Sequence, residues 1–115
     1  HHGSTVHLKP DLFLAMKCGE YEDRWFIEID LATESPATIL KKCERYYDYY
    51  RTNLEQRKHG VFPAIIWIVP DKARKEVLQT TIAKANQKNT KMFLIIMPDD
   101  LEKIIVNGFD SKDLC

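Results

Sequence analysis

The stretch RWFIEIDL, residues 24–31, decides the fold. Apolar residues alternate along it, and strict alternation predicts a strand whose two faces differ. One face is wholly apolar, and the other carries Phe26, Glu28 and Asp30, because successive side chains of a strand point to opposite sides. Two carboxylates therefore leave the same face, where their charges repel each other unless a proton or a cation is shared.

The residues around this strand predict a hairpin followed by a helix. An apolar run at residues 12–17 precedes the strand and a polar turn at residues 18–23 joins the two, so we expect antiparallel pairing. Ser35-Pro36 then predicts a helix start, because serine caps the first free N–H groups and proline fits the first helical position. We expect this helix to run to about Gln56. Its apolar stripe consists of Ile39, Cys43, Tyr46, Tyr50 and Leu54.

The second half of the chain alternates strands with helices. Uninterrupted apolar runs at residues 64–69 and 92–97 predict strands that are buried on both faces. A helix from Pro70-Asp71 separates them, and a last helix runs from Pro98 to about Val106. The middle helix is expected to turn Val77, Leu78, Ile82 and Ala85 inward. The predicted order is β-β-α-β-α-β-α, an α/β domain with a mixed four-stranded sheet flanked by helices.

Length and composition indicate one ordinary globular domain. The chain has 115 residues, and we interpret residues 1–5 as a tag or linker remnant and residues 6–115 as a single domain cut from a longer protein. The three cysteines have no metal-ligand spacing and are interpreted as reduced thiols, which favours a cytoplasmic location. No apolar run approaches the roughly 18 residues of a membrane helix, so we expect no membrane partner.

Charge is balanced overall but unevenly spread. The 17 basic and 17 acidic residues give a net charge of zero. Basic residues nevertheless predominate between Lys41 and Lys58 and between Lys72 and Lys91, whereas the tail from Asp99 to Asp113 is acidic. The basic stretches are either solvated helix faces or a surface for a phosphate backbone. On the second interpretation the DNA-binding residues are Lys41, Arg45, Tyr46, Lys72, Arg74 and Lys75.

Three carboxylates are expected to gather at one edge of the hairpin. Asp11, directly after Pro10, lies at the rim of the first strand, and pairing of the strands brings it towards Glu28 and Asp30. Oxygen-rich clusters of this kind bind Mg²⁺ for work on phosphates. Lys42 lies at the margin of the helix stripe, and its long side chain is expected to reach along the sheet edge.

These positions carry a resemblance to a known family. The matching residues are LKPD at 8–11, FIEIDLATE at 26–34, Leu40, Lys42, YYDYY at 46–50 and Phe62-Pro63. In this order they resemble the PD-(D/E)xK nuclease superfamily, and more narrowly the C-terminal domain of the replication-relaxation family of plasmids and conjugative elements. The resemblance covers roughly residues 8 to 97. It implies a restriction-endonuclease-like core with a winged-helix region upstream.

The resemblance also implies roles for the acids and the lysine. In an active member, Asp11, Glu28 and the carbonyl of Ile29 would bind Mg²⁺ or Mn²⁺, and Lys42 would assist the attacking water. Asp30 would bind a second ion or hold Lys42 in place. The chain departs from the superfamily pattern at Asp30, since that position normally holds a lysine.

Three functions stay open on the sequence alone. A catalytically silent nuclease-like domain, with no cofactor, would bind DNA or dock other replication or transfer proteins, with Glu28 and Asp30 in ion pairs with Lys42 and Arg45. An active Mg²⁺-dependent endonuclease or nickase would use Asp11, Glu28 and Lys42. An α/β protein-interaction module without DNA contact would expose a large apolar patch. The oligomeric state is not predicted.

Overall fold

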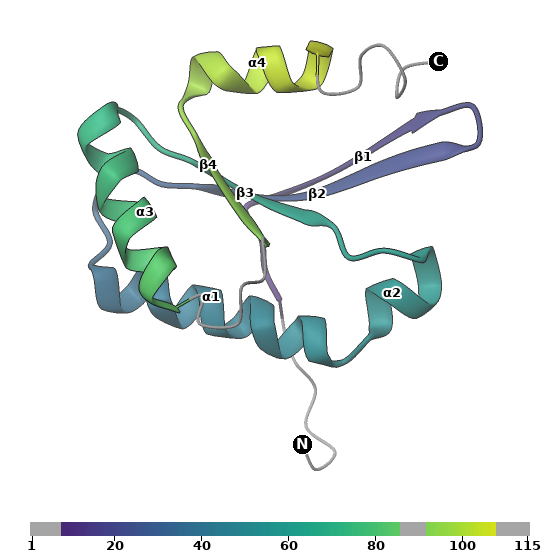
Figure 1. The fold of residues 1–115 in the computed structure, drawn as a ribbon, viewed down its shortest axis with the longest axis horizontal. Coiled ribbons are helices and arrows are strands. Elements are labelled where there is room, and N and C mark those ends of the chain that lie inside the picture. The colour runs from purple at the N-terminus through teal and green to yellow at the C-terminus, as the bar shows by residue number, and fades with distance from the viewer. Residues whose placement is uncertain (1–7, 86–91, 108–115) are drawn as a thin grey trace.

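The structure is a computed structural model that describes residues 8–85 and 92–107 (Figure 1). Its elements are β1 (Leu12–Cys18), β2 (Tyr21–Ile29), α1 (Pro36–Arg51), α2 (Leu54–His59), β3 (Ala64–Ile68), α3 (Lys72–Ala85), β4 (Phe93–Ile96) and α4 (Pro98–Asn107). The α/β class is confirmed. The order differs from the prediction by one additional helix, α2.

The hairpin has a tighter turn than its sequence suggests. β1 and β2 pair antiparallel with Leu12 opposite Ile27 and Cys18 opposite Tyr21. The turn between them is Gly19 and Glu20, and Gly19 adopts φ 64°, a left-handed conformation that glycine reaches without a steric penalty. β2 consequently begins at Tyr21, three residues before the expected Arg24 and inside the predicted polar turn.

The rest of the sheet is parallel. Phe26 of β2 lies opposite Ile65 of β3, and Ile65 lies opposite Phe93 of β4. The spatial order is β1-β2-β3-β4, with α1 and α2 between β2 and β3 and α3 between β3 and β4. The mixed four-stranded sheet is thus confirmed, and β1 and β4 form its two edges.

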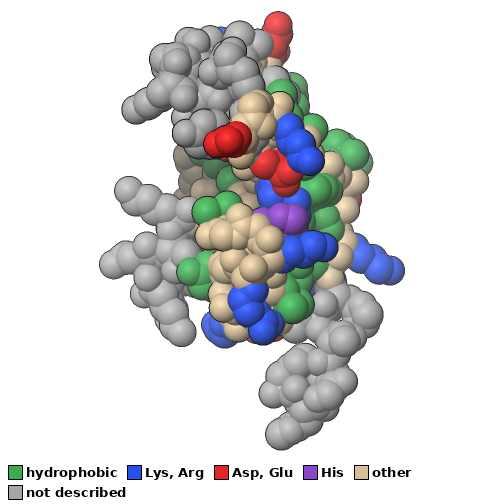
Figure 2. Space-filling model, turned by 90° about the vertical axis from the view of Figure 1, so that its right-hand side faces the viewer, with side chains coloured by type: hydrophobic (Ala, Val, Ile, Leu, Met, Phe, Trp, Pro, Cys, Tyr) green, Lys and Arg blue, Asp and Glu red, His purple; other side chains and the backbone are tan. Residues whose placement is uncertain are grey.

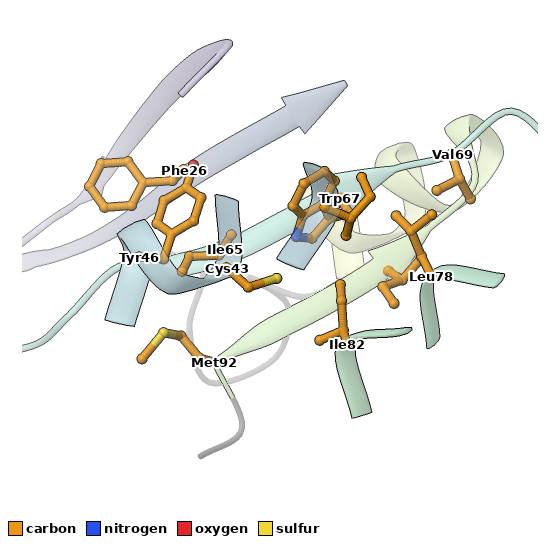
Figure 3. Close-up of a cluster of buried hydrophobic side chains, with 11 residues drawn as sticks. Phe26, Cys43, Tyr46, Ile65, Trp67, Val69, Leu78, Ile82 and Met92 are labelled. Atoms are coloured by element: carbon orange, nitrogen blue, oxygen red, sulfur yellow. The ribbon is translucent and has the colours of Figure 1, made fainter. Parts of the chain in front are cut away.

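Helices cover both faces of this sheet. Figure 1 shows α1 and α3 below it and α4 above it. The larger core lies on the α1–α3 side, and Figure 3 shows its side chains converging around Trp67. Its fully buried members include Ile39, Cys43, Tyr46, Ile65, Trp67, Val69 and Leu78. A smaller cluster of Trp25, Ile27, Ile66 and Ile96 packs under α4 with Leu101 and Ile104.

The long helix predicted from Pro36 to Gln56 is in fact two helices. α1 ends at Arg51, and Asn53 adopts φ 62°, in the left-handed region that asparagine tolerates better than most residues. A helix cannot continue through a left-handed residue, so α2 starts in a new direction at Leu54. The buried part of the predicted apolar stripe ends at Tyr46, since Tyr50 in the last turn of α1 and Leu54 at the start of α2 are exposed.

Three further burial predictions were wrong at single positions. Val77 is exposed, whereas Leu78 and Ile82 of the same helix are buried as predicted. Leu94 and Ala64 are also exposed, although their runs were predicted to be buried on both faces. β4 is an edge strand, and an edge strand has a neighbour on one side only.

Candidate functional site

The predicted acids lie where the parallel strands β2 and β3 end. Side chains at the carboxyl ends of neighbouring parallel strands share one edge of the sheet, and α/β domains place their sites there. Glu28 is the second-to-last residue of β2, and Asp30 is the first residue after the strand. The N–H of Asp30 donates to the carbonyl of Ile68 at 2.8 Å. Both side chains point to the α1–α3 side, because Glu28 contacts Tyr46 of α1 and Asp30 contacts Arg74 of α3.

Glu28 is a buried carboxylate with two partners on α1. Glu28 is only 3% exposed, and its carboxylate accepts a hydrogen bond from the Tyr46 hydroxyl at 2.5 Å. The ammonium of Lys42 lies 3.6 Å from its other oxygen. Burial raises the pKa of Glu28, and the negative charge of Asp11 adds to that rise, while Tyr46 and Lys42 oppose it. The predicted Glu28–Lys42 ion pair is present.

Asp30 pairs with Arg74, a residue that was predicted to bind DNA. Its side chain is fully buried, and Arg74 donates to both of its oxygens, at 2.7 and 2.9 Å. The same guanidinium donates to the Glu34 carbonyl at 2.8 Å. Asp71 fixes the start of α3 by accepting from the Arg74 N–H at 2.8 Å. The predicted partners of Asp30, Lys42 and Arg45, are wrong.

Lys42 bridges two acids instead of pairing with Asp30. Its ammonium bonds Glu34 at 2.9 Å and lies over the Trp67 ring, 5.9 Å from the ring centre. Burial lowers the pKa of Lys42, but the Glu34 hydrogen bond and the charges of Glu28, Glu34 and Asp11 outweigh it and raise the pKa. Glu34 was not predicted as a site residue. Glu34 does belong to the stretch FIEIDLATE that carries the family resemblance, directly before the helix cap Ser35, and this position was the one indication of a role in the site.

Asp11 closes the open end of the hairpin ladder. One oxygen of its exposed side chain accepts from the N–H of Ile29 at 2.7 Å, beyond the last paired residue of β1. Its charge reaches Glu28, whose pKa it raises. The structure therefore brings together Asp11, Glu28 and Lys42, and it keeps Asp30 apart in its own pair with Arg74.

The donor set does not fit a divalent cation in this arrangement. Mg²⁺ needs several free oxygens around one point. Both oxygens of Asp30 are bound to Arg74, and those of Glu28 face Tyr46 and Lys42. Within residues 8–85 and 92–107, no three His, Cys, Asp or Glu side chains surround a common ion position. Ile29 takes part through its N–H to Asp11.

The predicted DNA-binding residues divide into two groups. Lys41, Arg45 and Lys72 are exposed, and Lys75 is half-buried. Tyr46 is buried with its hydroxyl on Glu28, and Arg74 is engaged by Asp30, so neither presents its polar group at the surface. Arg57, Lys58 and His59 form a cationic end of α2; the first two belong to the basic stretch from Lys41 to Lys58, and neither was named individually as a DNA-binding residue. Figure 2 shows Lys, Arg and His side chains gathered on the side of the molecule where α2 lies.

Fold and site together define an α/β domain in which two buried carboxylates at the end of a mixed sheet are neutralised by cations from the covering helices. The sequence model of the replication-relaxation family matches residues 1–65, and the chain belongs to this family. The matched residues contain Asp11, Glu28, Asp30 and Lys42, while Arg74 lies outside them. No curated protein and no solved structure matches the chain. None of the described helices is long and apolar enough to cross a membrane.

Proposed function

We propose that this domain binds DNA through α1 and α2 during the replication or relaxation of a plasmid or mobile element, and that its buried acids serve the fold and not catalysis. One observation carries the proposal: the buried carboxylates have their own donors, whereas the helix cations remain free. Within the described part of the chain, Lys41, Arg45 and Lys58 have no acidic partner.

The free cations lie where they can follow a phosphate backbone. Lys41 and Arg45 are one turn apart on the surface of α1 opposite its buried face, and Lys58 extends the charge along α2. Arg57 lies beside Lys58, with its guanidinium donating to the Thr52 and Asn53 carbonyls. α1 and α2 lie on the same side of the sheet (Figure 1). Contacts from Lys and Arg to phosphates supply most non-specific DNA affinity and need no hydrogen-bonded pocket. This arrangement favours a binding role that is insensitive to base sequence.

Family membership supports the same process. The family is described by replication and relaxation, which are events on DNA. The proposal implies a cytoplasmic protein that acts beside other replication or transfer proteins. It requires no cofactor, because the acids stabilise the sheet end through Tyr46, Lys42 and Arg74.

Salt-dependent binding tests the proposal. Fluorescence anisotropy with a short labelled duplex should show affinity that falls linearly on a log–log plot, with a slope of about −0.9 for each phosphate contact. The double variant Lys41→Ala/Arg45→Ala should flatten the slope by about 1.8. Lys103→Ala is the matched control, since Lys103 is exposed on α4 across the sheet. No retention at low salt, or equal loss in the control, would refute the proposal.

A metal-dependent DNA nuclease is the second candidate, favoured by the convergence of Asp11, Glu28 and Lys42. It requires Tyr46 and Lys42 to release Glu28 when an ion enters. Calorimetry with Mn²⁺ or Mg²⁺ distinguishes the two. Heat of binding that disappears in Glu28→Gln, together with nicking of supercoiled plasmid by the parent, would replace the binding role by catalysis. A domain that neither binds DNA nor nicks it would instead be a protein-interaction module.

A further inference from the structure

β1 is an unusually apolar edge strand. It is the outer strand of the sheet, and no described strand pairs with its free side. Its first five residues, LFLAM, contain no charge, and Leu12 and Phe13 are 53% and 45% exposed. Natural edge strands usually carry a central charge, a proline or a bulge that prevents pairing with another chain. β1 has its first charge at Lys17, near its end.

The backbone groups that face outward can be assigned from two hydrogen bonds. The N–H of Ile29 points towards the β1 side, where it meets Asp11, and the N–H of Asp30 points to β3, where it meets Ile68. Backbone groups alternate in direction along a strand, so Ile27 also points to β1 and bonds its partner Leu12. The same alternation along β1 leaves the N–H and C=O groups of Phe13, Ala15 and Lys17 pointing outward.

We propose that β1 pairs antiparallel with β1 of a second copy of this chain across a twofold axis at Leu14. A twofold axis perpendicular to the sheet keeps each residue on its own face, so opposed residues must be both odd or both even in number. With Leu14 opposite Leu14, Phe13 meets Ala15, Leu12 meets Met16 and Asp11 meets Lys17. The outward groups of Phe13 and Ala15 then bond each other in both directions.

Charge selects this register over its neighbours. Centring the axis on Phe13 places Lys9 opposite Lys17, a like-charge pair that destabilises the contact. Centring it on Ala15 sets Phe13 against Lys17 and leaves Asp11 opposite Gly19. Only the Leu14 register sets an acid against a base at both ends of the contact. Asp11 keeps an oxygen for this pair, because it gives one to the Ile29 N–H.

Exposed apolar side chains flank the edge of the sheet where the second copy would pair. Leu12 shares a face with Ile29, which is exposed next to it on β2, and the Arg24 guanidinium covers the Phe13 ring on the opposite face at 4.7 Å. Pairing two hairpins converts two four-stranded sheets into one continuous eight-stranded sheet and removes one edge from each copy.

Crosslinking tests the register. A Leu14→Cys variant, with Cys18 and Cys115 replaced by serine, should form an intermolecular disulfide under mild oxidation. Opposed residues in a non-hydrogen-bonded pair have Cα atoms about 4.5 Å apart, within the range that a disulfide spans. Phe13→Cys and Ala15→Cys in the same background are the controls and should crosslink much less. Preferential crosslinking at either control position would overturn the register.

Molar mass tests the contact itself. Sedimentation equilibrium of the parent should give a concentration-dependent mass that approaches twice the 13.5 kDa of the chain. Ala15→Pro removes an outward N–H and leaves the β2 ladder intact, so it should give a folded monomer by circular dichroism. Lys17→Glu should also weaken the dimer, whereas Lys17→Arg should not. A parent that stays monomeric at millimolar concentration, or an Ala15→Pro variant that dimerises equally well, would overturn the proposal.

Discussion

Replacing Arg74 with methionine should destabilise the domain severely without weakening DNA binding. Arg74 neutralises the fully buried Asp30 with two hydrogen bonds of 2.7 and 2.9 Å and holds the Glu34 carbonyl at 2.8 Å. Methionine keeps most of the side-chain volume and removes all three donors. Asp30 is then a buried charge without a cation, which is one of the costliest defects in a protein interior.

The magnitude follows from burial and from the size of the domain. Removing one partner of a buried ion pair costs about 3–5 kcal/mol. A chain of this length has a total unfolding free energy of roughly 6–17 kcal/mol, so the loss is a large part of it. At about 4 °C per kcal/mol, the melting temperature should fall by roughly 12–20 °C.

Urea unfolding of four proteins measures the effect. Arg51→Met is the matched control, because Arg51 bonds Asp48 at an equally short 2.7 Å with side chains that are 58% and 57% exposed. We expect the control to lose less than about 0.5 kcal/mol, since solvent screens a surface pair. The double variant Asp30→Asn/Arg74→Met should recover part of the loss, because it removes the uncompensated charge. If Arg74→Met lowers the unfolding free energy as little as the control does, the reasoning is refuted. If Arg74→Met instead flattens the salt dependence of DNA binding, Arg74 contacts a phosphate.

Two further predictions concern Glu28 and the loop after it. Because the pKa of Glu28 is raised, its contribution to stability is complete below pH 4.5 and is lost as the pH rises through the folded-state pKa. Glu28→Gln should abolish this loss, which urea unfolding between pH 4 and pH 8 measures. Equal dependence of the unfolding free energy on pH in both proteins would contradict the prediction. Ala32 adopts φ 61°, a left-handed conformation in which any side chain is strained. Ala32→Gly should therefore raise the unfolding free energy by about 0.5–1 kcal/mol in the same assay. A decrease would show that no strain is present.

Local patterns predicted most of the elements. Alternation at residues 24–31 gave the strand and the shared face of Glu28 and Asp30, and Ser35 caps α1 as expected by accepting from the Thr38 N–H at 3.2 Å. The break at Asn53 was missed, because apolar spacing continues through Tyr50 and Leu54 although the backbone turns away. An asparagine next to a β-branched threonine is by itself only weak evidence for the end of a helix. The restriction-endonuclease-like assignment stays a prediction.

The sequence by itself determined the α/β class, the hairpin acids, the covering helix and the family. These depend on periodicity and short-range order, which neighbouring residues encode. Only the tertiary structure decided which cation neutralises which acid. Asp30 and Arg74 are 44 residues apart, and they meet because parallel pairing of β2 and β3 places the start of α3 over the end of β2. Because Arg74 occupies Asp30, the ammonium of Lys42 pairs with Glu28 and Glu34 instead.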